Sequence, residues 1–78
     1  MTKQSFMTPE ISFFSVFCIE ALADELEVSG DVVYKMLTEQ SDILDNYIVP
    51  YYDALHSQGK AYIVNELIEL MKKQGVLQ

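Results

Sequence analysis

An amphipathic segment near the C-terminus, residues 60–73, limits how this chain can fold. Its apolar residues recur at the i, i+3, i+4 and i+7 spacing of a helix with one buried stripe: Ile63, Val64, Leu67, Ile68, Leu70 and Met71. Charged and amide side chains fill the opposite face. Because an apolar stripe this wide must be buried, the helices upstream are expected to supply the surface that covers it.

Residues 9–26 form the predicted first helix. Thr8 is expected to cap it, with Pro9 at the first helical position and Glu10 beside the positive end of the helix dipole. Apolar side chains cover most of its circumference. Only a narrow polar strip is left for solvent: Ser12, Glu20, Asp24 and Glu27. A helix of this kind is expected at the centre of the fold or buried against another subunit.

A second helix is predicted from Ser29, which caps it, to about Gln40. Its expected buried residues are Val32, Val33, Met36 and Leu37. Asp31 falls in its first turn, where a negative charge favours the helix dipole.

A third helix is predicted to begin at Ser41. Pro50 lacks an amide donor and clashes with the preceding turn, so a kink or break is expected near Val49. The helix then resumes through Leu55 and stops at Gly59, which suits a left-handed cap.

The resulting fold class is all-α: a compact four-helix single domain with helix-turn-helix-like packing of helices 1 and 2. The domain is expected to span residues 9–75, after a flexible N-terminus of residues 1–8. Its core is expected between the first and last helices. A chain of 78 residues is long enough for one domain, with a thin margin of stability.

Residues 22–37 match the packing pattern of a helix-turn-helix, which favours a transcriptional regulator as the alternative function. The charges argue against nucleic acid. The chain has no arginine, and the predicted recognition helix carries Asp31 and Glu39. DNA binding would require four lysines to cluster in space: Lys35, Lys60, Lys72 and Lys73.

The net charge of −7 is concentrated in the middle of the chain, where residues 20–45 hold eight acidic residues and one lysine. A basic protein surface would be attracted there, although a solvated acidic face is the simpler interpretation. The lone Cys18 and the lack of a secretion signal predict a cytoplasmic protein. The longest apolar run, residues 11–23, is too short to span a membrane.

Polar aromatic residues gather around the break at Pro50, and His56 lies among them. A catalytic interpretation would use His56 as acid or base, with Asp53 orienting it. In a structural interpretation, His56 donates a hydrogen bond to carbonyl groups at a helix C-terminus. This interpretation is favoured because the sequence offers no activated nucleophile. Cys18 is expected to be inert in an apolar helix. No catalytic residue, cofactor or metal site is therefore predicted.

The favoured function is a non-catalytic protein-interaction module. Its candidate interaction surface is formed by Asp24, Glu25, Glu27, Asp31, Tyr51, Tyr52 and His56. The expected partner is a basic protein, or a second copy that covers leftover apolar surface on the first helix.

Three segments carry a resemblance that spans about residues 10–74. They are the run Phe14-Ser-Val-Phe-Cys-Ile-Glu20, the run Tyr52-Asp-Ala-Leu-His-Ser-Gln-Gly59 and the run Tyr62-Ile-Val-Asn-Glu-Leu67. With these features the chain resembles the small bacterial family called domain of unknown function 3791. The resemblance implies a compact helical cytosolic domain of bacteria with no assigned catalytic residues. The resemblance also implies that the gene is encoded beside that of a second small family resembling ADP-ribosyltransferases, and hence an accessory or antitoxin-like role.

Overall fold

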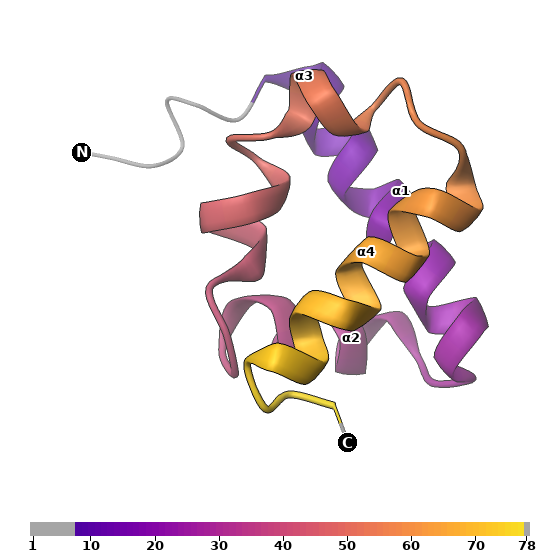
Figure 1. Ribbon diagram of the computed structural model, residues 1–78, viewed down its shortest axis with the longest axis vertical. Coiled ribbons are helices and arrows are strands. Elements are labelled where there is room, and N and C mark those ends of the chain that lie inside the picture. The colour runs from indigo at the N-terminus through magenta and orange to yellow at the C-terminus, as the bar shows by residue number, and fades with distance from the viewer. Residues whose placement is uncertain (1–7, 78) are drawn as a thin grey trace.

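The computed structural model describes residues 8–77, and within this range the chain is all-α, as predicted. Three helices of at least nine residues and two short ones form a single compact body (Figure 1). Their bounds are α1 Pro9–Leu26, α2 Gly30–Thr38, η2 Leu44–Ile48, α3 Tyr52–Leu55 and α4 Lys60–Lys73. Residues 1–7 of the segment predicted to be flexible lie outside the described residues.

The first helix begins as predicted. Thr8 adopts an extended backbone conformation, and its Oγ1 accepts a hydrogen bond from the Ile11 amide at 3.2 Å. Pro9 follows at the first helical position, where its missing amide hydrogen costs nothing. The helix ends at Glu27, whose φ of 59° and ψ of 45° are left-handed, and the Val28 amide donates back to the Ala23 carbonyl at 3.1 Å.

The outer face of α1 is more exposed than its composition predicted. The helix buries Cys18, Ala21 and Leu22 against its neighbours, while large apolar residues on the other side remain in contact with solvent. The prediction that only a narrow polar strip reaches water is therefore wrong. The reason is the small size of the domain: α1 packs against α2 and α4, and no further helix is left to cover its outer side.

The second helix is capped by Ser29, as predicted, because its Oγ accepts a hydrogen bond from the Val32 amide at 3.4 Å. It buries Val33 and Leu37, which are four residues apart, but Val32 is 42% exposed and was wrongly placed in the core. A helix of nine residues contributes one narrow seam to the core, and Val32 points away from that seam.

The predicted third helix is divided at Pro50, as expected, but its first half is not an α-helix. Residues 44–48 form a π-helix in which the Val49 amide donates to the Leu44 carbonyl at 3.0 Å. Ile43 and Ile48 are both buried although they are five residues apart, which is the spacing of a π turn. Sequence periodicity did not reveal this wider turn.

Gly59 does not close the preceding helix. Its φ of −72° and ψ of 159° are extended, and it stands at the N-terminus of α4. The prediction of a left-handed cap at Gly59 is therefore wrong, because the short α3 ends in turns at residues 56–58 that any residue can form.

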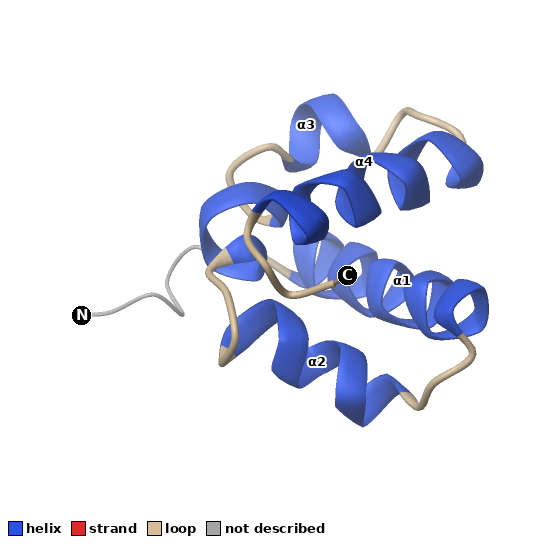
Figure 2. Ribbon diagram, turned by 60° about the horizontal axis from the view of Figure 1, so that its bottom comes forward, coloured by secondary structure: helices blue, strands red, loops and turns tan. Residues whose placement is uncertain are grey.

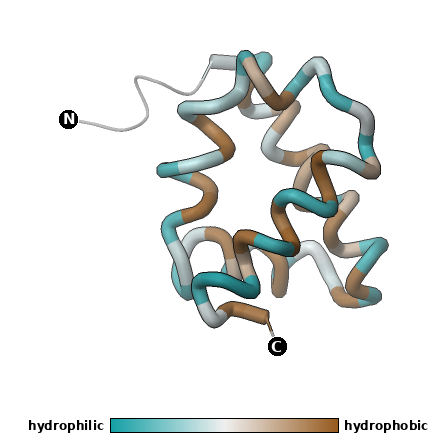
Figure 3. The backbone as a smooth tube through the Cα atoms, viewed as in Figure 1, coloured by the Kyte–Doolittle hydropathy of each residue, from teal (hydrophilic) through white to brown (hydrophobic). Residues whose placement is uncertain are grey.

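The core lies where α1, α2, η2 and α4 meet (Figure 2). In Figure 3 the hydrophobic residues of α4 follow one side of the helix, and hydrophilic residues follow the other. The predicted stripe is confirmed, since Ile63, Val64, Leu67 and Met71 are buried. None of the helices formed by the described residues has the length and apolar character that a membrane span requires.

Candidate interaction surface

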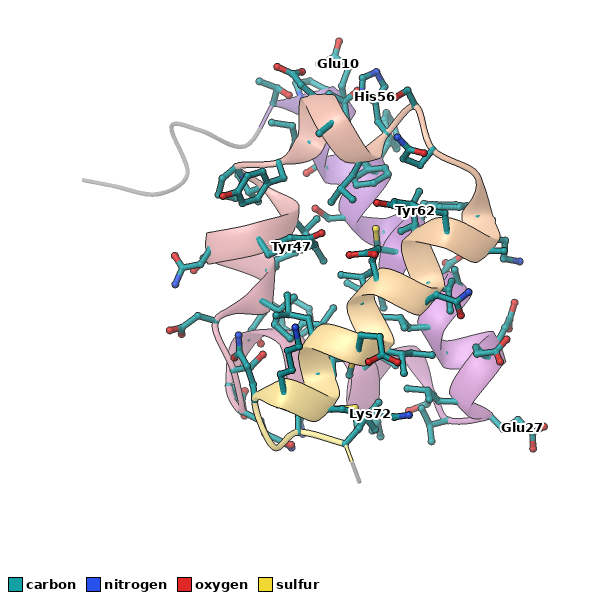
Figure 4. The ribbon with its side chains drawn as sticks, viewed as in Figure 1. Glu10, Glu27, Tyr47, His56, Tyr62 and Lys72 are labelled. Atoms are coloured by element: carbon teal, nitrogen blue, oxygen red, sulfur yellow. The ribbon has the colours of Figure 1, made fainter. Side chains whose placement is uncertain are left out.

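The structure divides the predicted interaction surface into two groups. Asp24, Glu25, Glu27 and Asp31 surround the turn between α1 and α2, whereas Tyr51, Tyr52 and His56 belong to the region of α3. Figure 4 shows His56 and Glu27 at opposite ends of the molecule. Tyr52 contacts Phe14 near the start of α1, and 13 residues of helix, about 20 Å, separate Phe14 from Glu27. The seven residues therefore lie in two groups at opposite ends of α1.

His56 is held by the backbone of its own helical turn. Its Nδ1 lies 2.9 Å from the Tyr52 carbonyl oxygen, and because a carbonyl only accepts, Nδ1 carries the proton in this hydrogen bond. The imidazole also stacks on the Tyr52 ring, with centroids 4.5 Å apart and planes inclined by 13°. Asp53, the carboxylate considered in the catalytic interpretation, does not hold this nitrogen. The geometry fits the structural interpretation of His56.

Phe14 connects this pair of rings to the first helix. Its ring meets Tyr52 edge-on at a centroid distance of 5.5 Å, and it lies 6.1 Å from the ring of Phe17. An aromatic row thus runs from His56 through Tyr52 and Phe14 to the outer side of α1. Rings in such contact stabilise one another beyond the area that they bury, so the row ties α3 to α1.

The row ends at an exposed apolar surface on α1. Phe13 is 77% exposed, Val16 is 51% exposed and Phe17 is 40% exposed. Their spacing of three and four residues places them on one face of the helix. We call these three residues the α1 patch. The excess of apolar residues in this helix indicated leftover surface, but only the packing of α2 and α4 shows which side is left uncovered.

Carboxylates flank the α1 patch along the same face of the helix. At about 100° per residue, Glu10, Glu20 and Asp24 all lie within about 60° of Phe13 around the circumference. All three are exposed. On the outer face of α1, the apolar patch therefore has an acidic residue before it and two acidic residues after it.

A small pocket between η2 and α4 was not anticipated from the sequence. Its volume is about 80 Å³, and it is lined by Tyr47, Glu66, Glu69, Leu70 and Lys73. Burial raises the pKa of Tyr47, and the neighbouring carboxylate of Glu66 raises it further. The pocket is well below the roughly 300–1,000 Å³ that is usual for sites of drug-sized ligands.

The described residues contain no group of three side chains that could hold a metal ion. Cys18 is fully buried, and burial raises the pKa of its thiol to about 12, so the thiol stays protonated and unreactive at neutral pH.

The four lysines needed for a DNA-binding surface do not gather in one place. Lys60 begins α4 and Lys73 ends it, so these two are about 20 Å apart along the helix axis. Lys72 lies at the same end as Lys73, far from His56 and Glu10 in Figure 4. The expectation that all four lysines cluster is therefore not met, since Lys60 stands apart from Lys72 and Lys73.

Comparisons with known proteins add one finding. Neither the curated proteins nor the solved structures include a significant match to this chain. A family model described as "Protein of unknown function (DUF3791)" matches residues 13–74. This range contains the aromatic row, the α1 patch and every residue of the buried core cluster. The chain therefore belongs to the DUF3791 family.

Proposed function

We propose that this protein is a non-catalytic protein-interaction module and that the α1 patch is its contact surface. The observation that carries the proposal is the exposure of Phe13, Val16 and Phe17 side by side on the central helix. Large apolar residues clustered in this way are typical of surfaces that are covered by another molecule. Aromatic residues are also enriched among the side chains that contribute most to binding.

The proposed setting is the bacterial cytoplasm, where the protein would act as an accessory or antitoxin-like partner of a neighbouring-gene product. A reducing compartment agrees with a single cysteine that is buried and unpaired with another cysteine. A partner would use the α1 patch as its anchor, and a second copy of this chain is the competing occupant.

A pull-down from the native host tests the proposal. The double variant Phe13→Ser/Phe17→Ser is expected to lose the proteins that the wild-type bait retains, because it removes the anchor residues. Circular dichroism and thermal unfolding check that this variant remains folded, because Phe17 is only 40% exposed and its ring packs against Phe14. The matched control is Tyr34→Ser on α2, where the side chain is 51% exposed and lies outside the patch. Equal retention by all three baits would overturn the proposal.

A helix-turn-helix regulator is the second candidate, and the packing of α1 against α2 across the short turn at residues 27–29 favours it. In that role α2 would enter the major groove. An electrophoretic shift at low salt, lost in Lys35→Glu, would support this role. The separation of Lys60 from Lys73 weighs against it.

A further inference from the structure

We infer that the α1 patch binds a helix of a different protein, one with an apolar stripe flanked at both ends by lysine or arginine. This inference rests on the proposed interaction function and names the class of partner. It follows from the order of charges along α1 and not from the apolar residues alone.

The α1 patch has the shape that a helical partner requires. Phe13 and Phe17 are one helical turn apart, and Val16 completes a narrow ridge on the same face. A ridge of this kind interdigitates with the groove between side chains of a second helix. Phe17 is supported from beneath by Phe14, which in turn rests against Tyr52, so the ridge has a packed aromatic base.

Exposed carboxylates mark both ends of the ridge. Glu10 stands one turn before Phe13, and Glu20 stands one turn after Val16. They are ten residues apart, which is about 15 Å along α1. A helix lying along the patch would therefore meet an apolar centre with a negative charge at each end. Asp24 extends the negative charge toward the α1–α2 turn.

A second copy of the chain does not satisfy this arrangement. In an antiparallel pair of α1 helices centred on the patch, Glu10 of one copy would lie opposite Glu20 of the other. In a parallel pair, Glu10 would face Glu10 and Glu20 would face Glu20. Both orientations set carboxylate against carboxylate, and like charges juxtaposed across an interface oppose association. Both molecules also carry a net charge of −7. Basic residues at a spacing of about ten positions would instead meet each carboxylate with an opposite charge.

A charge-swapped copy of the protein supplies a partner of this chemistry. The variant Glu10→Lys/Glu20→Lys keeps the apolar patch and presents lysine at both ends of it. Sedimentation of a mixture with the wild-type chain is expected to show a heterodimer, whereas each protein alone stays monomeric. Raising the salt concentration from about 0.05 M to about 0.5 M should weaken the heterodimer about tenfold, since it screens the flanking pairs.

Two matched variants locate the contact. Glu66→Lys/Glu69→Lys makes the same change of charge on α4, away from the patch, and should not pair with the wild-type chain. Phe13→Ser in the charge-swapped copy should abolish the heterodimer while keeping the lysines. Circular dichroism confirms that each variant is folded, which matters for Glu10 because it lies in the first turn of α1.

A wild-type chain that dimerises alone, and loses this dimer in Phe13→Ser, would make a second copy the occupant and overturn the inference. Failure of the charge-swapped copy to bind, or equal binding by the α4 control, would also overturn it. None of these results removes the interaction function, which the pull-down with Phe13→Ser/Phe17→Ser tests separately.

Discussion

At the scale of single residues, Cys18 shows how burial in the core changes the acidity of a side chain. It is fully buried on the inner face of α1 among apolar neighbours, where it acts as a small hydrophobic residue. Burial favours the neutral thiol and raises its pKa from 9.0 to about 12. Between pH 9 and pH 12 the thiol therefore keeps its proton in the folded state and loses it in the unfolded state.

The pH dependence of stability is the first prediction. Between pH 9 and pH 12 the unfolded chain loses the Cys18 proton while the folded chain keeps it. The unfolded state binds fewer protons there, so the free energy of unfolding should fall as the pH rises, by at most about 1.4 kcal/mol per pH unit. Below pH 9 this contribution is fully present.

Urea denaturation at a series of pH values from neutral to alkaline measures this dependence. Cys18→Ala provides the control, because it lacks the titrating group and leaves the tyrosines in place. Its stability should fall less steeply above pH 9 than that of the wild-type chain. Parallel slopes for the two proteins would show that the thiol is not protected as the structure indicates.

Glu27 is the second informative residue, since it alone among the described non-glycine residues has a positive φ. A left-handed conformation is unfavourable for residues other than glycine, by about 1–2 kcal/mol in a helical context. This cost is offset because the conformation lets the Val28 amide donate a hydrogen bond to the Ala23 carbonyl at the end of α1. Local composition did not point to this cap, as glutamate has no preference for it.

At the scale of elements, the start of α4 lacks the side-chain cap that α1 and α2 have. Gly59 occupies the capping position but has no side chain to accept a hydrogen bond from the first amides of the helix. Its backbone is extended, and nothing lies within 4 Å of the place where a Cβ would sit. A capping side chain could therefore be added without steric cost.

Gly59→Ser is predicted to stabilise the protein by about 0.5–1 kcal/mol. The serine would accept a hydrogen bond from an amide in the first turn of α4, and it would reduce the freedom of the unfolded chain. Gly59→Ala is the matched control, because it restricts the chain without capping the helix. Thermal unfolding should place the serine variant above the alanine variant. The reverse order would contradict the assignment of Gly59 as the cap.

The buried stripe of α4 makes the third prediction. Leu67 is fully buried in the middle of the stripe, and Leu67→Ala should cost about 2–5 kcal/mol. That loss is large against the roughly 5–15 kcal/mol that typical domains have in total. Asn65→Ala, on the exposed face of the same helix, should change the stability very little. Similar midpoints for both variants in chemical denaturation would show that the stripe is not buried.

At the scale of the whole molecule, α1 is the element that the others share. It packs against both α2 and α4, and its aromatic row reaches α3. Among the described residues, every buried hydrophobic residue except Leu55 of α3 belongs to one cluster, which α1, α2, η2 and α4 share. The helices are therefore expected to form and melt together.

A single cooperative unfolding transition is the fourth prediction. Far-ultraviolet circular dichroism follows the helices and near-ultraviolet signals follow the tyrosines, and the two should give the same midpoint. Leu22→Ala, in α1, should lower both midpoints equally. A tyrosine transition that precedes the loss of helix would show instead that α3 and η2 unfold on their own.

The sequence alone determined the helices and several of their ends. Thr8 and Ser29 cap α1 and α2, Pro50 divides the third segment, and the apolar spacing of α4 defines its buried stripe. These features were predictable because each depends on residues within one or two turns of one another. Capping, proline geometry and helical periodicity are local properties.

Only the tertiary structure decided which side of α1 remains exposed. Phe13 and Cys18 are similarly apolar and five residues apart, yet one is 77% exposed and the other is fully buried. Their different fates depend on where α2 and α4 settle, and α4 lies more than thirty residues farther along the chain. The π turn of η2 and the separation of the predicted interaction residues have the same origin. Burial is set by contacts between distant segments, and local patterns carry no information about which of two apolar faces those segments will cover.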